Sequence, residues 1–280
     1  MRARPIIASL VVVLGLASFA GQAHAAPTRA ATQPLFSVTG AVVRVTSPAA
    51  YHAQGTQFAD TSRVPLQLTN VQYFVVTGTL VNGEYQYPYH VTAARGVVVG
   101  GIELADNHQA NTQLVAIGIP TAASAAAMDR QSPESATSAA SLSTAPSTSY
   151  AGDAPLHLIW YDPAKIWLVQ VYDILHWQYD FLHVYFSSTN DYSQLLWQDG
   201  WHTDWENYSW GYGQSYHQSV WNNTSGVYEN DLFCFTVTQV HVNHNESIGW
   251  YDGTRTAYVD TYNSGTGSCW TLIHYFWKWG

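Results

Sequence analysis

The sequence predicts a mainly β protein: two small β modules joined by a flexible linker, the second a disulfide-tied, aromatic-rich β-sandwich or barrel. Three observations favour this fold class. Short runs rich in Val, Ile, Thr and aromatic residues recur between Gly, Asn and Asp turn signals. All twelve tryptophans lie within 156–280. Between the two β-rich parts the composition changes to Ala, Ser, Thr and Pro.

Residues 1–25 predict a secretory signal peptide. Arg2 and Arg4 precede an apolar run over 6–20, and Ala23-His24-Ala25 supplies a small-x-small cleavage signal. No later run reaches the roughly 20 apolar residues that a membrane-spanning helix needs. We therefore expect a secreted, extracellular protein without a transmembrane segment in its mature chain.

Residues 34–120 predict the first module, a small β domain. Asn82-Gly83 joins two β-prone runs and favours the positive φ angles of a type I′ hairpin turn. The runs 96–104 and 112–119 predict two further strands. This module contains no recognisable catalytic constellation, so the sequence assigns it no function.

Residues 121–155 predict the flexible linker. The segment has few large apolar side chains, so burial cannot offset the entropy lost on ordering it. A short Ala-rich helix near Ala123–Met128 is the local alternative.

Residues 156–280 predict the second module, with Asp252-Gly253 at the tip of a hairpin. Cys234 and Cys269 are the only two cysteines, and an oxidising compartment would join them. The bridge would tie the strand around Cys234 to the last strand, around Cys269. It would contribute roughly 3–4 kcal/mol of stability in the chain-entropy model.

The segment 163–186 carries two competing patterns. Asp162-Pro163 is typical of a helix start, and Asp173, His176, Asp180 and His183 would share one helix face. Apolar and polar residues alternate over 175–181, which favours a strand. We expect a short helix followed by a strand from about residue 175, with those four polar residues on a solvated face.

The charge of the second module limits its partners. Residues 156–280 carry three cationic side chains against twelve acidic ones. Such a surface repels nucleic acids and anionic lipids, so we discount both as partners. Neutral polymers, cations and basic proteins remain.

The densest aromatic stretch is "WQDGWHTDWENYSWGYG", at 197–213. Exposed aromatic rings serve as flat platforms for pyranose rings, and neighbouring polar groups hydrogen-bond the hydroxyls. The predicted ligand-binding residues are Trp201, Trp205, Trp210, Tyr212, Asp204 and Glu206. For any single tryptophan a place in the core is the better interpretation, because a small β domain needs large buried rings.

The order Asp199-Gly200, Asp204, Trp205, Glu206 resembles the D-G-x-D-x-D-x-E strand of one chitinase family. The resemblance covers eight residues and implies that Glu206 protonates the leaving oxygen while Asp204 orients the acetamido group. Neighbouring His202 replaces a carboxylate of that pattern. The resemblance also implies a β/α barrel of about 250 residues, whose strand–helix repetition the chain does not show.

Metal sites are not predicted. His241, His244 and Glu246 lie close in sequence, but on a regular strand the two histidines would face opposite ways. We interpret 243–246 as a solvated polar turn, and we expect neither metal nor cofactor.

The function that the sequence favours is therefore a secreted, non-catalytic protein that binds carbohydrate or a cell-envelope polymer through its second module. One alternative is a small extracellular glycoside hydrolase using Asp204 and Glu206, with His202 as a further candidate. The other is a secreted factor that binds or antagonises other proteins. The sequence does not decide whether the protein is an enzyme, although it favours a binding role over a catalytic one.

Overall fold

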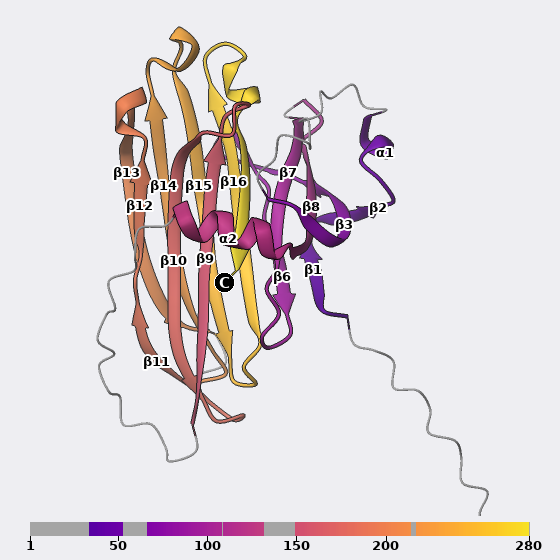
Figure 1. Cartoon of the computed structure of the whole chain (residues 1–280), viewed down its shortest axis with the longest axis vertical. Coiled ribbons are helices and arrows are strands. Elements are labelled where there is room, and N and C mark those ends of the chain that lie inside the picture. Colours follow the sequence, from indigo (N-terminus) through magenta and orange to yellow (C-terminus); the bar gives the residue numbers. More distant parts are fainter. Residues whose placement is uncertain (1–33, 53–65, 108, 132–148, 214–216, 280) are drawn as a thin grey trace, which may run out of the picture. The chain divides into compact units, whose positions relative to one another are not determined.

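The computed structural model describes residues 34–52, 66–107, 109–131, 149–213 and 217–279 (Figure 1). Residues 34–280 form one compact unit. Its elements are β1 (Phe36–Gly40), β2 (Val42–Val45), α1 (Ala49–His52), β3 (Leu68–Thr77), β4 (Thr79–Val81), β5 (Glu84–Gln86), β6 (Tyr89–Ala93), β7 (Gly100–Asn107), β8 (Thr112–Pro120), α2 (Ala122–Gln131), β9 (Tyr150–Tyr161), β10 (Trp167–Tyr179), β11 (Val184–Thr189), β12 (Tyr192–Leu195), η2 (Trp197–Asp199), β13 (Trp201–Tyr212), β14 (Ser219–Asn230), η3 (Phe233–Phe235), β15 (Thr238–Trp250), β16 (Arg255–Gly265), η4 (Cys269–Leu272) and β17 (His274–Trp279).

The strands form two large antiparallel sheets. One has six strands in the order β1-β6-β16-β15-β14-β13. The other has nine, with the path β11-β10-β9-β17-β7-β8-β3-β2 and β12 added against β10. The mainly β prediction is confirmed, as is the Asn82-Gly83 hairpin, which forms the separate β4–β5 ribbon with positive φ at both turn residues. Among the described residues, no helix is both long and apolar enough to cross a membrane.

The two expected modules, 34–120 and 156–280, contribute strands to the same sheets. Val91 of β6 lies opposite Ala257 of β16, and Ile102 of β7 lies opposite Phe276 of β17. The division into two modules is therefore not apparent in the structure. Strand pairing across more than 160 residues leaves no trace in local composition, so the sequence pattern suggested a boundary that the sheets do not follow.

The expected linker, 121–155, contains regular structure at both ends. Helix α2 occupies its start, in agreement with the Ala-rich alternative, and β9 begins at Tyr150. Helix α2 is anchored because Met128 is buried and Ser124 Oγ accepts a 2.7 Å hydrogen bond from the Gln67 N–H. The flexible-linker prediction is thus wrong at these ends. Residues 132–148 and the predicted signal peptide lie outside the described residues.

The main core lies between the two sheets and combines aliphatic side chains with large rings such as Trp160, Trp177 and Trp277. A second apolar cluster lies on the outer face of the nine-stranded sheet. There Ile159 and Phe276 pack with Tyr51 of α1 and Met128 of α2, which crosses that face (Figure 1).

The segment 163–186 is a strand over 167–179, without the expected helix. The Asp162 carboxylate accepts hydrogen bonds of 2.9 Å from the N–H groups of Ala164 and Ile166, which closes a turn instead of capping a helix. Asp173 is fully buried between the sheets and accepts a hydrogen bond from Ser247. The expectation of a solvated face is therefore wrong for Asp173, and burial raises the pKa of its carboxyl well above the usual value.

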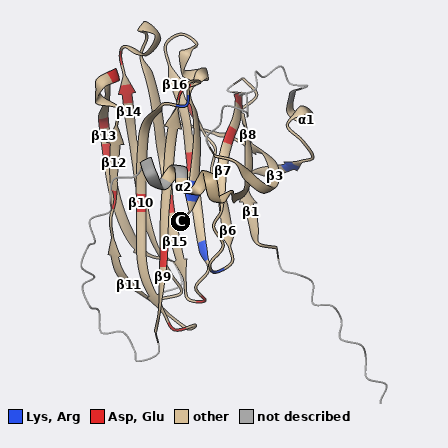
Figure 2. Ribbon diagram, in the orientation of Figure 1, with Lys and Arg blue, Asp and Glu red and all other residues tan. Residues whose placement is uncertain are grey.

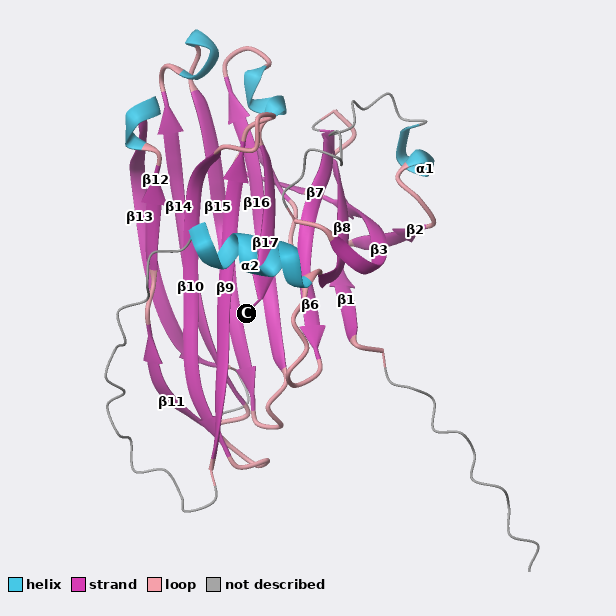
Figure 3. Ribbon diagram, in the orientation of Figure 1, coloured by secondary structure: helices cyan, strands magenta, loops and turns pink. Residues whose placement is uncertain are grey.

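The predicted disulfide joins Cys234 to Cys269, with a Cα–Cα distance of 6.1 Å. The cysteines lie in η3 and η4, short 3-10 helices, rather than in the strands that the sequence suggested. Together with η2 these helices gather at one end of the six-stranded sheet (Figure 3). The hairpin predicted at Asp252-Gly253 closes the other end, between β15 and β16.

Candidate ligand surface on the six-stranded sheet

Strand β13 forms an edge of the six-stranded sheet and contains a β-bulge. Thr203 lies opposite Tyr228 and Trp205 opposite Val227, so Asp204 is an extra residue without a partner in β14. A bulge shifts the alternation of side chains along a strand. Trp201 therefore points into the core, whereas Trp205 points away from it.

The predicted ligand residues on β13 do not form one site. Trp201 is 1% exposed, so this part of the prediction is wrong: the ring fills the core. Trp205 is 46% exposed on the outer face. Trp210 is 49% exposed but stacks on Phe186 of the other sheet, with ring centroids 3.8 Å apart. Tyr212 is half-buried beside it, and its hydroxyl accepts a hydrogen bond from the Phe186 N–H.

The two carboxylates of the chitinase-like pattern have different surroundings. Glu206 lies opposite Gly226 and accepts a 2.5 Å hydrogen bond from the Tyr228 hydroxyl, on the inner side of the sheet. Asp204 is exposed at the bulge. On a regular strand, residues 204 and 206 would point to one side, but the bulge at Asp204 breaks this alternation. The described chain is a pair of packed antiparallel sheets, not the β/α barrel that the resemblance implies.

A second bulge, at Asn243 in β15, changes the outer face of the sheet. Val242 pairs with Thr261 and His244 with Asp260, which leaves Asn243 without an opposite residue. The bulge brings His241 and His244 to the same face. The interpretation of 243–246 as a solvated turn is wrong, since these residues belong to a strand in the middle of the sheet.

Aromatic and imidazole rings line this outer face across neighbouring strands. His90 of β6 stacks on Tyr258 of β16, with centroids 4.3 Å apart and planes inclined by 6°. His244 stacks on the same tyrosine at 4.9 Å. Further along, His241 stacks on Tyr262 at 4.3 Å. His90, Tyr258 and His244 thus form one stacked row across β6, β16 and β15, whereas His241 and Tyr262 form a separate pair that is largely buried.

Two further tryptophans lie on this face, outside the stacked row. Trp221 of β14 lies against Gly211 of β13, where a larger side chain would clash with the indole. Trp250 of β15 donates a 2.9 Å hydrogen bond from Nε1 to the Thr256 hydroxyl. Both rings remain partly exposed. The β4–β5 hairpin reaches this face at Tyr262, whose hydroxyl donates to Glu84.

The outer face is polar without being cationic. Strands β13, β14 and β15 contain no Lys or Arg, which are sparse in the described chain as a whole (Figure 2). Burial lowers the pKa of both His90 and His244, which favours the neutral form of each imidazole. Burial raises the pKa of Glu246 to about 7, so near neutral pH its carboxyl exists in both the donating and the accepting form.

We call this region the outer-face surface. It comprises the rings and polar groups that project from the outer side of β6, β16, β15, β14 and β13: His90, Tyr258, His244, Glu246, Trp250, Trp221, Asn223 and Trp205.

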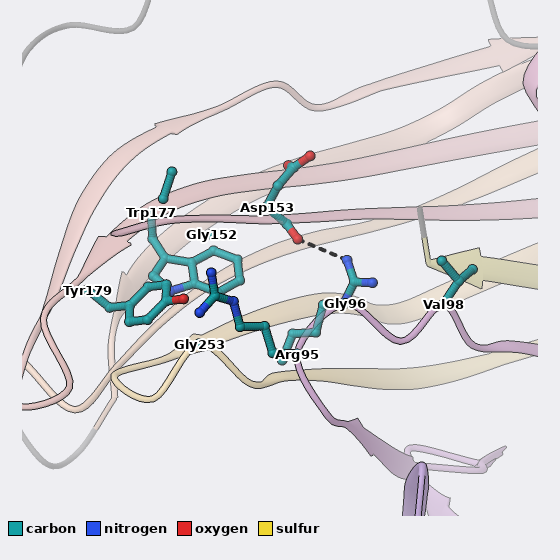
Figure 4. A pocket seen from close by; sticks show the side chains of 10 residues that line it. Arg95, Gly96, Val98, Gly152, Asp153, Trp177, Tyr179 and Gly253 are labelled. Atoms are coloured by element: carbon teal, nitrogen blue, oxygen red, sulfur yellow. Dashed lines mark hydrogen bonds between the residues drawn. The ribbon is translucent and has the colours of Figure 1, made fainter. Parts of the chain in front are cut away.

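A different site lies at the opposite end of the sheet, beside the β15–β16 turn. It is a pocket of about 330 Å³ lined by Arg95, Trp177, Tyr179 and Arg255 (Figure 4). Arg95 extends along the Tyr179 ring, with the guanidinium carbon 5.8 Å from the ring centroid. The two arginines distinguish this pocket from β13, β14 and β15, which contain no Lys or Arg.

Arg255 ties together the segments around the pocket. Its Nη1 and Nη2 donate 2.9 Å hydrogen bonds to the backbone carbonyls of Asp153 and Val97, respectively. Its guanidinium carbon lies 4.9 Å from the centroid of the Trp279 ring. Because one buried side chain joins β9, β16, β17 and the loop after β6, we assign it a structural role.

Sequence reasoning found Trp205 but missed most of the outer-face surface. His90, Trp221, Trp250 and Tyr258 lie far apart in the sequence and meet only because their strands are neighbours. The sequence shows these rings, but it does not show which strands are neighbours in the sheet. No family model, curated protein or solved structure matches this chain.

Proposed function

We propose that this protein is a secreted, non-catalytic binding protein that holds a neutral polysaccharide on its outer-face surface. The observation that carries the proposal is the group of partly exposed rings, interleaved with amide and carboxyl groups, on an open sheet face. Flat rings bury the apolar faces of pyranose units, and the polar groups between them hydrogen-bond the hydroxyls.

The charge of the surface favours a neutral ligand. An anionic polymer would meet no Lys or Arg on β13, β14 or β15, and burial favours the neutral form of the His90 and His244 imidazoles. Hydroxyl groups suit Glu246, because its carboxyl can donate and accept hydrogen bonds near neutral pH.

The dimensions favour a chain over a single sugar. The surface crosses five neighbouring strands, which corresponds to about 19 Å at the usual strand spacing. The stacked rings of His90, Tyr258 and His244 follow this direction across three of the strands, so an extended polymer would contact rings from several strands at once.

The test is binding to a panel of neutral and acidic polysaccharides, measured by pull-down and by isothermal titration of soluble oligosaccharides. Wild-type protein should bind at least one neutral glycan. Trp205→Ala and Tyr258→Ala should each weaken binding at least tenfold, because each removes a ring platform. Trp210→Ala is the matched control: it removes a similarly exposed ring from the same strand, but on the other side.

Circular dichroism should show that all three variants remain folded. The proposal fails if no neutral glycan binds. It also fails if Trp210→Ala reduces binding as much as Trp205→Ala, since the ligand would then contact the edge of the sandwich.

A further inference from the structure

We propose that His202, Glu229 and Asp231 form a zinc-binding site at the η2–η3 end of the six-stranded sheet. Each of the three offers one ligand atom, and these atoms all lie within 4.8 Å of one another. The site does not depend on the proposed function, because it requires no glycan.

The fold brings these side chains together in two ways. His202 of β13 lies directly opposite Glu229 of β14 in the strand register, on the outer side of the sheet. Asp231 follows the last residue of β14, where the chain turns towards η3. The site therefore joins the edge strand to the loop that carries Cys234.

Hydrogen bonds orient two of the ligands. His202 Nδ1 lies 3.3 Å from the Gly200 carbonyl oxygen, which favours a proton on Nδ1 and leaves the Nε2 lone pair available. That Nε2 lies 3.9 Å from Glu229 Oε1. The other carboxylate oxygen, Oε2, accepts a hydrogen bond from Gln239. Metal-binding imidazoles and carboxylates are typically held by such outer hydrogen bonds, which point the ligand atoms at the metal.

The donor set matches zinc. One imidazole nitrogen and two carboxylate oxygens are common zinc ligands, and three protein ligands leave a fourth position for water or a ligand oxygen. Calcium prefers six to eight oxygen ligands, which this group does not supply. Bound tetrahedrally, the ligand atoms would lie about 3.3 Å apart. His202 and Asp231 are accessible enough to rotate by this amount.

Charge gives a second reason for a cation here. Glu229 and Asp231 place two carboxylates close together beside an imidazole, and the described Lys and Arg side chains do not form an ion pair with either. A divalent ion would remove this repulsion and link β13 to the η3 loop.

The test is isothermal titration of the full chain with zinc chloride, together with a thermal melt with and without zinc. Zinc should bind and raise the melting temperature. His202→Gln and Asp231→Asn should each weaken zinc binding at least tenfold and abolish the thermal shift. Gln239→Ala should weaken binding by a smaller factor, because it removes only the orientation of Glu229.

The matched control is His176→Gln. His176 Nδ1 lies 3.1 Å from the Asp153 carboxylate, so this variant removes a histidine–carboxylate pair for which the described residues supply no third ligand. It should bind zinc like the wild type. The proposal is overturned if zinc does not bind at millimolar concentration, if His202→Gln binds it unchanged, or if calcium binds more tightly than zinc.

Discussion

The outer faces of the two sheets differ, although both are rich in aromatic residues. On the nine-stranded sheet, Phe276 and Ile159 are buried beneath α1 and α2 and form a second apolar core. On the six-stranded sheet, Tyr258 and Trp221 lie among imidazole, amide and carboxyl groups and remain partly exposed. The comparison shows that an aromatic side chain is available to a ligand only where no other element of the fold covers it.

The difference follows from the residues between the rings. Apolar neighbours on the nine-stranded sheet must be shielded from water, which makes a covering helix favourable. On the six-stranded sheet the rings alternate with polar side chains, so the face carries less apolar surface that needs a cover. The predictions below test this comparison.

The largest expected effect concerns one ring on each face. Phe276→Ala should lower the free energy of unfolding by about 3–5 kcal/mol, because Phe276 is 1% exposed beneath α2 and its removal leaves a cavity. Tyr258→Ala should cost about 1 kcal/mol or less, since it loses only cross-strand contacts. Urea denaturation of both variants measures the difference. Similar costs would show that the six-stranded face acts as a core as well.

The next effect concerns the loops at the end of the six-stranded sheet. Replacing both Cys234 and Cys269 with serine should lower stability by roughly 3–4 kcal/mol, because the bridge closes a loop with a sequence separation of 35. Denaturation of the variant and of wild type under the same non-reducing conditions measures this cost. Wild type under reducing conditions is the control and should show a similar loss. Equal stability would mean that η3 and η4 are held by their other contacts.

The smallest effect is a pH dependence that arises on the outer-face surface. Burial raises the pKa of Glu246 from 4.5 to about 7, so the unfolded chain loses this proton at lower pH than the folded chain. The contribution of Glu246 to stability should therefore fall as the pH rises from about 4.5 to about 7. Glu246→Gln should remove about 1–3 kcal/mol of this fall. Melting temperatures at pH 5 and pH 8 test this, and an unchanged pH dependence in the variant would contradict it.

The sequence predicted those features that depend on a few neighbouring residues or on composition. Asn82-Gly83 and Asp252-Gly253 form the turns that their backbone preferences indicate, and the only two cysteines form the bridge. The sequence did not indicate which side of the sheet each side chain of β13 and β15 occupies. A single extra residue, Asp204 or Asn243, shifts the alternation, and such bulges have no strong signature in the sequence.

By itself, the sequence determined that the protein is mainly β, that two of its hairpin turns lie at Asn82-Gly83 and Asp252-Gly253, and that Cys234 can join only Cys269. These features follow from backbone preferences and composition, which act over a few residues or through elimination. Only the tertiary structure decided that strands from both halves share two sheets, that Trp201 is buried while Trp205 is exposed, and that His202 lies beside Glu229. These outcomes depend on which strands become neighbours, and that choice is made by burial and hydrogen bonding across the whole chain.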